Sequence, residues 1–210
     1  MGLTIHYSGQ LKSPALIKDF VAELADVADS MGWTHQVIND DFSKEPDARL
    51  VHTSHGAEIQ GNLGLKGISI SPHQECEPCT FFFDRDGRLW DIVDAIGRQR
   101  HDKEYVPSVH VKTQFAPADV HISIIKLLKY LEKVYFARFQ VKDEGSYWQT
   151  GDEKVLREKL AFLNEKLDQV AAALENSEEE LKSAASESEL ADKIERILLE
   201  RFKRRSGESS

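Results

Sequence analysis

The feature that most constrains this chain is a change in residue usage near position 150. From Gly151 onward the sequence contains no Pro, Cys, His, Trp or Tyr, and it is rich in Leu, Ala, Glu and Lys. These residues favour helices. All eight histidines and both cysteines lie in front of this point. The chain therefore divides into a mixed front part, residues 1–150, and a helical back part, residues 151–210.

A stripe of apolar residues runs along the back part at alternating steps of four and three. The stripe lapses between Asn176 and Glu189 and then resumes. This spacing gives a helix a narrow apolar seam for a partner helix, so it predicts a helical hairpin or a coiled-coil extension. The same seam could instead pack on the front domain. Its members are Leu156, Leu160, Leu163, Leu167, Val170 and Leu174, and then Leu190, Ile194, Ile197, Leu198 and Phe202.

Two capping boxes mark where these helices should begin. Thr150 precedes Glu153 by three residues, and Ser186 precedes Glu189 by the same interval. In such a box each side chain accepts a hydrogen bond from the other residue's free backbone N–H. The pattern predicts one helix after Thr150 and a second after Ser186.

The front part opens with a strand, a helix and a second strand. Leu3–Tyr7 alternates in polarity, as a half-buried strand does. Ser13 followed by Pro14 is typical of a helix start, and Gly32 suits the left-handed residue that ends a helix. The next apolar segment, Trp33–Ile38, predicts the second strand.

The remainder of the front part reads as hairpins and a second helix. Asp86–Gly87 between two apolar runs predicts a hairpin turn. A helix begins after Pro117, and its apolar positions recur at helical spacing. We therefore predict an α+β fold, with a mainly antiparallel (mixed) sheet covered by two helices. The further predicted strands are short ones within 39–66, then 67–71, 80–83, 89–92, 109–115 and 139–141.

Charge and hydropathy exclude several classes of function. The 36 acidic and 27 basic residues give a net charge of −9. This argues against broad binding to nucleic acid or an anionic membrane, but it leaves room for a local basic patch. No apolar run approaches the roughly 20 residues of a membrane span. The start lacks a secretory pattern, and two cysteines fit a reducing compartment, so we predict a cytoplasmic protein with no membrane or nucleic-acid partner.

The segment around Cys76–Glu77–Pro78–Cys79 carries the most suggestive chemistry. Over these four residues it resembles the dithiol motif of thioredoxin-like proteins. Those motifs lie at a helix N-terminus, which lowers the thiol pKa. Here a strand and not a helix should follow the motif, and the negative charge of Glu75 would raise the thiol pKa. A dithiol redox protein acting through Cys76 and Cys79 is one alternative function.

Histidines near the same segment suggest a second alternative, a zinc site. His73, Cys76 and Cys79 are spaced by two residues each way, and His52 and His55 form a similar pair upstream. Tetrahedral zinc takes His and Cys ligands from such pairs. This cluster would suit a zinc-dependent hydrolase. The simpler interpretation is that these are ordinary loop and core residues and that the protein needs no cofactor.

Two loops with aromatic residues suggest a ligand or partner surface. One contains Gln114 and Phe115, and the other contains Tyr147 and Trp148. Exposed aromatic rings offer a large contact area at a low entropic cost. Tyr147 and Trp148 could instead fasten the back part to the core. The function that we expect is a non-catalytic cytosolic binding or regulatory protein, with self-association or a protein partner at the C-terminal helices.

Overall fold

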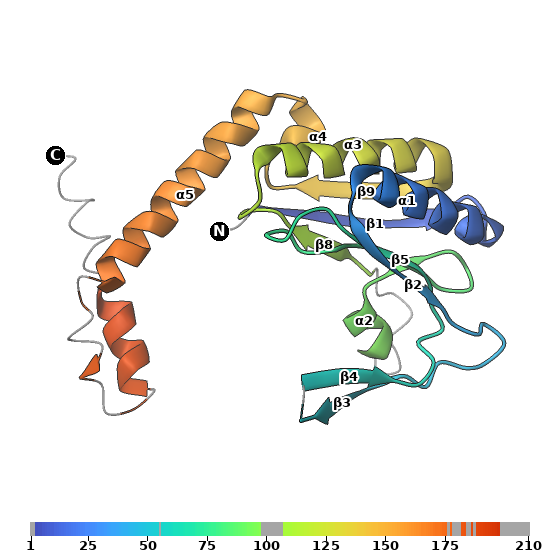
Figure 1. The fold of residues 1–210 in the computed structure, drawn as a ribbon, viewed down its shortest axis with the longest axis horizontal. Helices are drawn as coiled ribbons and strands as arrows, with labels where there is room; N and C mark the ends of the chain where they lie inside the picture. Colours follow the sequence, from blue (N-terminus) through green and yellow to red (C-terminus); the bar gives the residue numbers. More distant parts are fainter. Residues whose placement is uncertain are drawn as a thin grey trace. The chain divides into compact units, whose positions relative to one another are not determined.

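The computed structural model describes residues 3–54, 56–97 and 107–175, and after them residues 177, 182–183, 186 and 188–197. The chain divides into two compact units, Met1–Arg157 and Glu158–Ser210. The first holds the sheet and its helices, and the second holds most of the C-terminal helix (Figure 1).

The strands of the first unit form two antiparallel sheets and a separate hairpin. One sheet has the order β8-β1-β9, the other has β2-β5-β6-β7, and β3 pairs with β4. Every strand pair is antiparallel. The strands are β1 (Thr4–Leu11), β2 (Thr34–Asn39), β3 (Arg49–Thr53), β4 (Gly56–Gln60), β5 (Lys66–Ser71), β6 (Cys79–Phe83), β7 (Leu89–Trp90), β8 (Val109–Lys112) and β9 (Phe136–Asp143).

The two larger sheets meet along β1. Gln10 bridges to Arg88 beside β7, and Leu11 N donates to Gly87 O at 2.9 Å. Farther along β1, the Tyr7 hydroxyl donates to Thr80 O at 2.9 Å and accepts from Thr80 N at 3.1 Å. A buried side chain thus pairs with the β6 backbone where a neighbouring strand would otherwise do so.

Two long helices, α1 (Ile17–Met31) and α3 (Ala118–Tyr135), lie over one side of this strand layer (Figure 1). Ser13 Oγ accepts from Ala15 N in the short turn η1 (Pro14–Leu16), and Gly32 ends α1 with a φ of 68°. Phe20 of α1 packs edge-on against Phe83 and Tyr135, with ring centroids 5.0 Å apart in both pairs. Burial of such rings provides much of the stabilising free energy of a core.

The predicted fold class is therefore confirmed: an α+β fold with antiparallel strands and two covering helices. The short strands expected within 39–66 are β3 and β4. Two short helices, α2 (Ile92–Gly97) and α4 (Tyr147–Thr150), were not predicted. No helix among the described residues has the length and apolar content needed to cross a membrane.

Of the two capping boxes predicted for the C-terminal helices, one differs in the structure and one has the expected hydrogen bond. Helix α5 (Glu153–Glu175) follows Asp152, whose Oδ1 accepts from Lys154 N at 2.8 Å. Thr150 Oγ1 instead accepts from Asp152 N, so the predicted box starting at Thr150 is wrong. Residues 188–197 are helical, and there Ser186 Oγ accepts from Glu189 N as predicted.

Candidate functional site

A buried polar network lies at one end of the β8-β1-β9 sheet. Thr113 directly follows β8, His121 is in the first turn of α3, and Asp143 is the last residue of β9. The strand register places Asp143 opposite Ile5 and Lys112 opposite Thr4. The antiparallel pairing therefore brings the three polar residues to the same sheet end.

These three side chains are in contact with one another. His121 Nδ1 lies 2.7 Å from Thr113 Oγ1, and His121 Nε2 lies 3.1 Å from Asp143 Oδ1. The second contact brings the imidazole against the carboxylate, but its alignment falls short of a hydrogen bond.

The backbone after β9 supplies further donors to Asp143. Gly145 N donates to Oδ1 at 2.7 Å, and Trp148 N donates to Oδ2 at 2.9 Å. Burial raises the pKa of Asp143, but the contact with His121 and these two N–H groups outweigh it and lower the pKa below its ordinary value. Asp143 is therefore a carboxylate that holds the following loop in place.

The order hydroxyl, imidazole, carboxylate is that of a nucleophile, a base and an orienting acid. In this network, however, the side chains of His121 and Asp143 have no exposed surface, and Thr113 is buried. Thr113 Oγ1 also donates to Leu3 O at 3.2 Å. A substrate carbonyl has no access to this hydroxyl, so the arrangement fastens β1, α3 and the β9–α4 loop together.

The four residues of the predicted ligand surface lie in different environments near this network. Gln114 and Tyr147 are buried, and Trp148 is half-buried. The Trp148 ring packs 6.4 Å from the Phe139 ring of β9, which fits the fastening role. Phe115 alone among the four is exposed, at 58%. The four therefore do not form one open groove.

Gln114 is an unusual buried amide. It is 6% exposed, and its Oε1 has no hydrogen-bond partner among the described residues. A buried polar atom without a partner destabilises the fold by about 1–3 kcal/mol. Gln114 follows Thr113 directly, so the β8–α3 connection holds two of the few polar side chains in this core.

The two cysteines are free thiols in the core of the first unit. Burial raises the pKa of Cys76 to about 11, and the charge of Glu77 adds to this effect. Cys79 is fully buried at the start of β6, and its burial also raises its pKa. A redox dithiol needs a lowered thiol pKa. The pKa values of Cys76 and Cys79 are both raised, which is the opposite of what this chemistry needs.

The residues suggested as zinc ligands are spread over different elements. His52 is exposed on β3, and His55 lies outside the described residues. His73 is in the loop before β6, where its Nδ1 accepts from Glu75 N at 3.1 Å. Within the described part of the chain, no three His, Cys, Asp or Glu side chains are grouped so as to hold a metal ion.

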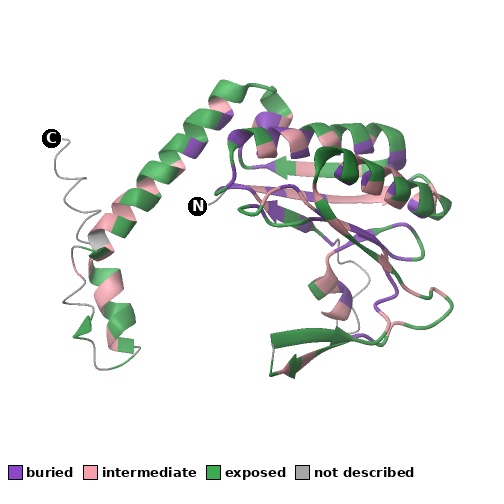
Figure 2. Cartoon of the chain, in the orientation of Figure 1, coloured by how far each residue is buried: buried purple, intermediate pink, exposed green. Residues whose placement is uncertain are grey.

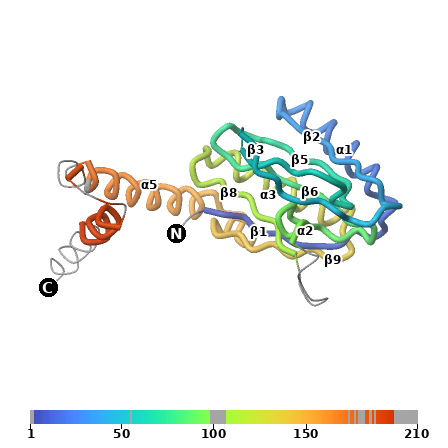
Figure 3. The backbone as a smooth tube through the Cα atoms, turned by 90° about the horizontal axis from the view of Figure 1, so that it is seen from below, coloured from blue at the N-terminus to red at the C-terminus, as the bar shows by residue number. Residues whose placement is uncertain are grey.

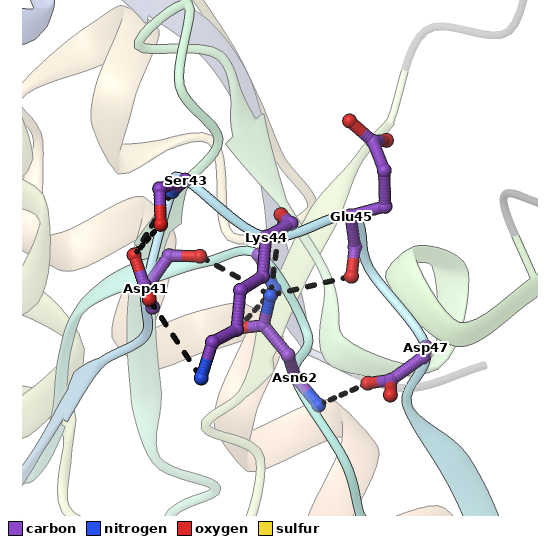
Figure 4. Close-up of polar contacts among 7 residues, drawn as sticks. Asp41, Ser43, Lys44, Glu45, Asp47 and Asn62 are labelled. Carbon is purple, nitrogen blue, oxygen red and sulfur yellow. Dashed lines mark hydrogen bonds and ion pairs between the residues drawn. The ribbon is translucent and has the colours of Figure 1, made fainter.

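Asn62 organises the loop between β2 and β3 (Figure 4). Its Nδ2 donates to the carbonyl oxygens of Asp41, Lys44 and Glu45 at 3.2, 3.4 and 3.5 Å. Its backbone N donates to Asp47 Oδ1 at 2.6 Å. The converging carbonyls could suggest a cation site, but the Asn62 amide nitrogen occupies their centre.

The leucine seam of α5 changes its burial along the helix (Figure 2). Leu156 and Leu160, at its start, are buried. Leu167 is 38% exposed, and Leu163 and Leu174 are half-buried. The later part of the seam therefore retains apolar surface that this chain leaves uncovered.

Sequence reasoning found part of this arrangement. The segments of Gln114 and Tyr147, which adjoin the network, were predicted as loops with aromatic residues. Asp143 was missed because an acid at the end of a strand looks like an ordinary turn residue. An acid followed two residues later by Gly145 was the available signal, since a carboxylate there can accept from the next loop.

Comparison with known proteins gives no relative: no family model, no curated protein and no solved structure matches this chain.

Proposed function

We propose that the protein is a non-catalytic cytosolic binding or regulatory protein that associates through its C-terminal helices. The observation that carries the proposal is the seam of α5. Its later positions, including Leu167 and Val170, are exposed or half-buried in the single chain. A narrow apolar stripe at heptad spacing gains stability when a second helix covers it.

The residues that flank the α5 seam favour a second copy of this chain as the partner that covers it. In a parallel pair, the residue before Leu160 or Leu167 faces the residue that follows Leu163 or Val170 of the other helix. This places Lys159 and Lys166 opposite Asn164 and Ala171, which carry no charge. Two identical helices therefore meet without like-charge repulsion.

The chemistry of the described residues favours a binding role over catalysis. The thiol pKa values are raised, and the Thr113–His121–Asp143 network is closed to substrate. Free buried thiols are also consistent with a reducing compartment, which supports the cytosolic location.

Sedimentation velocity on the full chain tests the association. We expect a dimer for the wild type and a monomer for Leu167→Asp, which places a charge on the seam. Ala161→Asp adds the same charge at an exposed position off the seam and should leave the dimer intact. A monomeric wild type with no co-purifying protein would overturn the proposal.

A further inference from the structure

The side of the β8-β1-β9 sheet that faces away from α1 and α3 is basic. Ile5, Tyr7, Val109 and Val111 point into the core, so the alternate residues point outward. Figure 3 shows the paths of the neighbouring strands β8, β1 and β9, and their register arranges the outward residues in cross-strand rows. We call this side the outer face; its members are Thr4, His6, Ser8 and Gln10 of β1, His110 and Lys112 of β8, and Arg138, Gln140 and Lys142 of β9.

The central row of the outer face consists of one lysine and two histidines. His6 pairs with His110 on one side and with Lys142 on the other. The two imidazole rings lie with their centroids 6.1 Å apart and their planes tilted by 39°. His110 and Lys142 are exposed, and His6 is half-buried.

An exposed aromatic ring borders the same face. Phe115 follows β8, and the Lys112 ammonium lies 5.7 Å from the centre of its ring. At the other end of the face, Gln10 pairs with Arg138 and bridges to Arg88, and both arginines are exposed. The rings and two lysines therefore lie toward one end of the face and the arginines toward the other, with the uncharged Ser8–Gln140 pair between them.

Among the described residues, few acidic groups oppose this charge. Glu144 Oε2 accepts from Thr4 N at 3.0 Å, and Glu77 Oε2 accepts from Lys112 N at 2.9 Å. Both carboxylates thus lie at the Lys112 end of the face. At the other end, exposed Asp86 lies beside Gln10, whose Nε2 donates to the Asp86 carbonyl at 3.2 Å. The paired positions of the His6 and Gln10 rows themselves hold no acid. A basic face in a chain of net charge −9 is a local separation of charge.

We propose that the outer face binds single-stranded nucleic acid, which departs from the prediction that the net charge of the whole chain gave. Lysine and arginine side chains neutralise phosphates, and exposed rings stack on bases that are free of a duplex. Here Arg138, Lys142 and Lys112 supply the charges, and His6, His110 and Phe115 supply the rings. An acidic peptide would use the same charges but would not need the rings.

Fluorescence anisotropy with a labelled oligouridylate of about 20 nucleotides tests the proposal on the full chain. Arg138→Glu/Lys142→Glu should weaken binding about tenfold or more and should flatten the dependence of affinity on salt. Lys18→Glu/Lys126→Glu makes the same charge change at exposed positions of α1 and α3, and it should alter affinity less than about twofold.

A second pair of measurements separates stacking from charge. Phe115→Ala should weaken binding to the oligonucleotide but leave binding to a poly-glutamate peptide unchanged. Circular dichroism checks that each variant is folded. Equal losses in the two charge-reversed variants, an absence of oligonucleotide binding, or peptide binding that is as tight as oligonucleotide binding would each overturn the assignment.

Discussion

His121 Nε2 lies 3.1 Å from Asp143 Oδ1, and neither side chain has any exposed surface. The two residues come from different elements, the first turn of α3 and the end of β9. Asp143 is a buried carboxylate, and removing a polar partner from a buried carboxylate is destabilising, because the charge then loses part of its compensation. The pair therefore couples the position of α3 to the loop that leads to α4.

Replacing Asp143 should change both stability and its dependence on pH. Because the folded state lowers the pKa of Asp143, the stabilisation is present above the ordinary aspartate pKa and is lost as pH falls through the lowered value. Asp143→Asn should unfold at a lower urea concentration than the wild type at pH 7. Its stability should also fall less steeply than that of the wild type as the pH is lowered. Urea midpoints at pH 7 and at about pH 3 measure both effects.

Asp152→Asn is the matched control for this prediction. Asp152 is an exposed aspartate in the same region, and its main role is to cap α5. Asparagine also caps helices, so this variant should keep the wild-type midpoint at both pH values. Equal midpoints for Asp143→Asn and the wild type would contradict the structural role of the pair.

Removing the Tyr7 hydroxyl should destabilise the sheet. Burial raises the pKa of Tyr7 well above its ordinary value, so the group stays protonated and keeps both hydrogen bonds to Thr80. Tyr7→Phe leaves the N–H and the carbonyl of Thr80 without these partners, which should lower the free energy of unfolding by about 1–3 kcal/mol. Amide hydrogen exchange at Thr80 should accelerate, and an unchanged rate would refute this account.

Asn62→Ala should loosen the loop between β2 and β3 while leaving the main core intact. The substitution removes the donors to the carbonyls of Asp41 and Lys44, and the expected loss is about 1 kcal/mol. Hydrogen exchange over residues 41–48 should increase, whereas exchange in β1 should not. Asn39→Ala, at an exposed end of β2, serves as the control and should change neither region.

The two thiols should react slowly in the folded protein. Since the pKa of Cys76 is about 11, only a small fraction is thiolate at pH 8. Alkylation by iodoacetamide at pH 8 should therefore be much slower than in about 6 M guanidinium chloride, where both cysteines become exposed. Rapid alkylation of folded Cys76 would instead revive the redox hypothesis.

Local signals predicted much of the fold. Ser13 and Gly32 bound the first helix region as expected, and the Asp86–Gly87 turn joins β6 to β7. These features depend on residues that are close in sequence. The site was harder to predict because Thr113, His121 and Asp143 meet only through strand pairing over long separations. Tyr7 and Thr80 likewise meet through tertiary packing, which leaves no local pattern.

The way Tyr7 completes the sheet also bears on how freely this chain can be altered. The backbone N–H and carbonyl of Thr80 in β6 form hydrogen bonds with the Tyr7 side chain and not with the backbone of a neighbouring strand. A single hydroxyl therefore holds β1 of one sheet to β6 of the other, so position 7 tolerates little change without loss in both sheets.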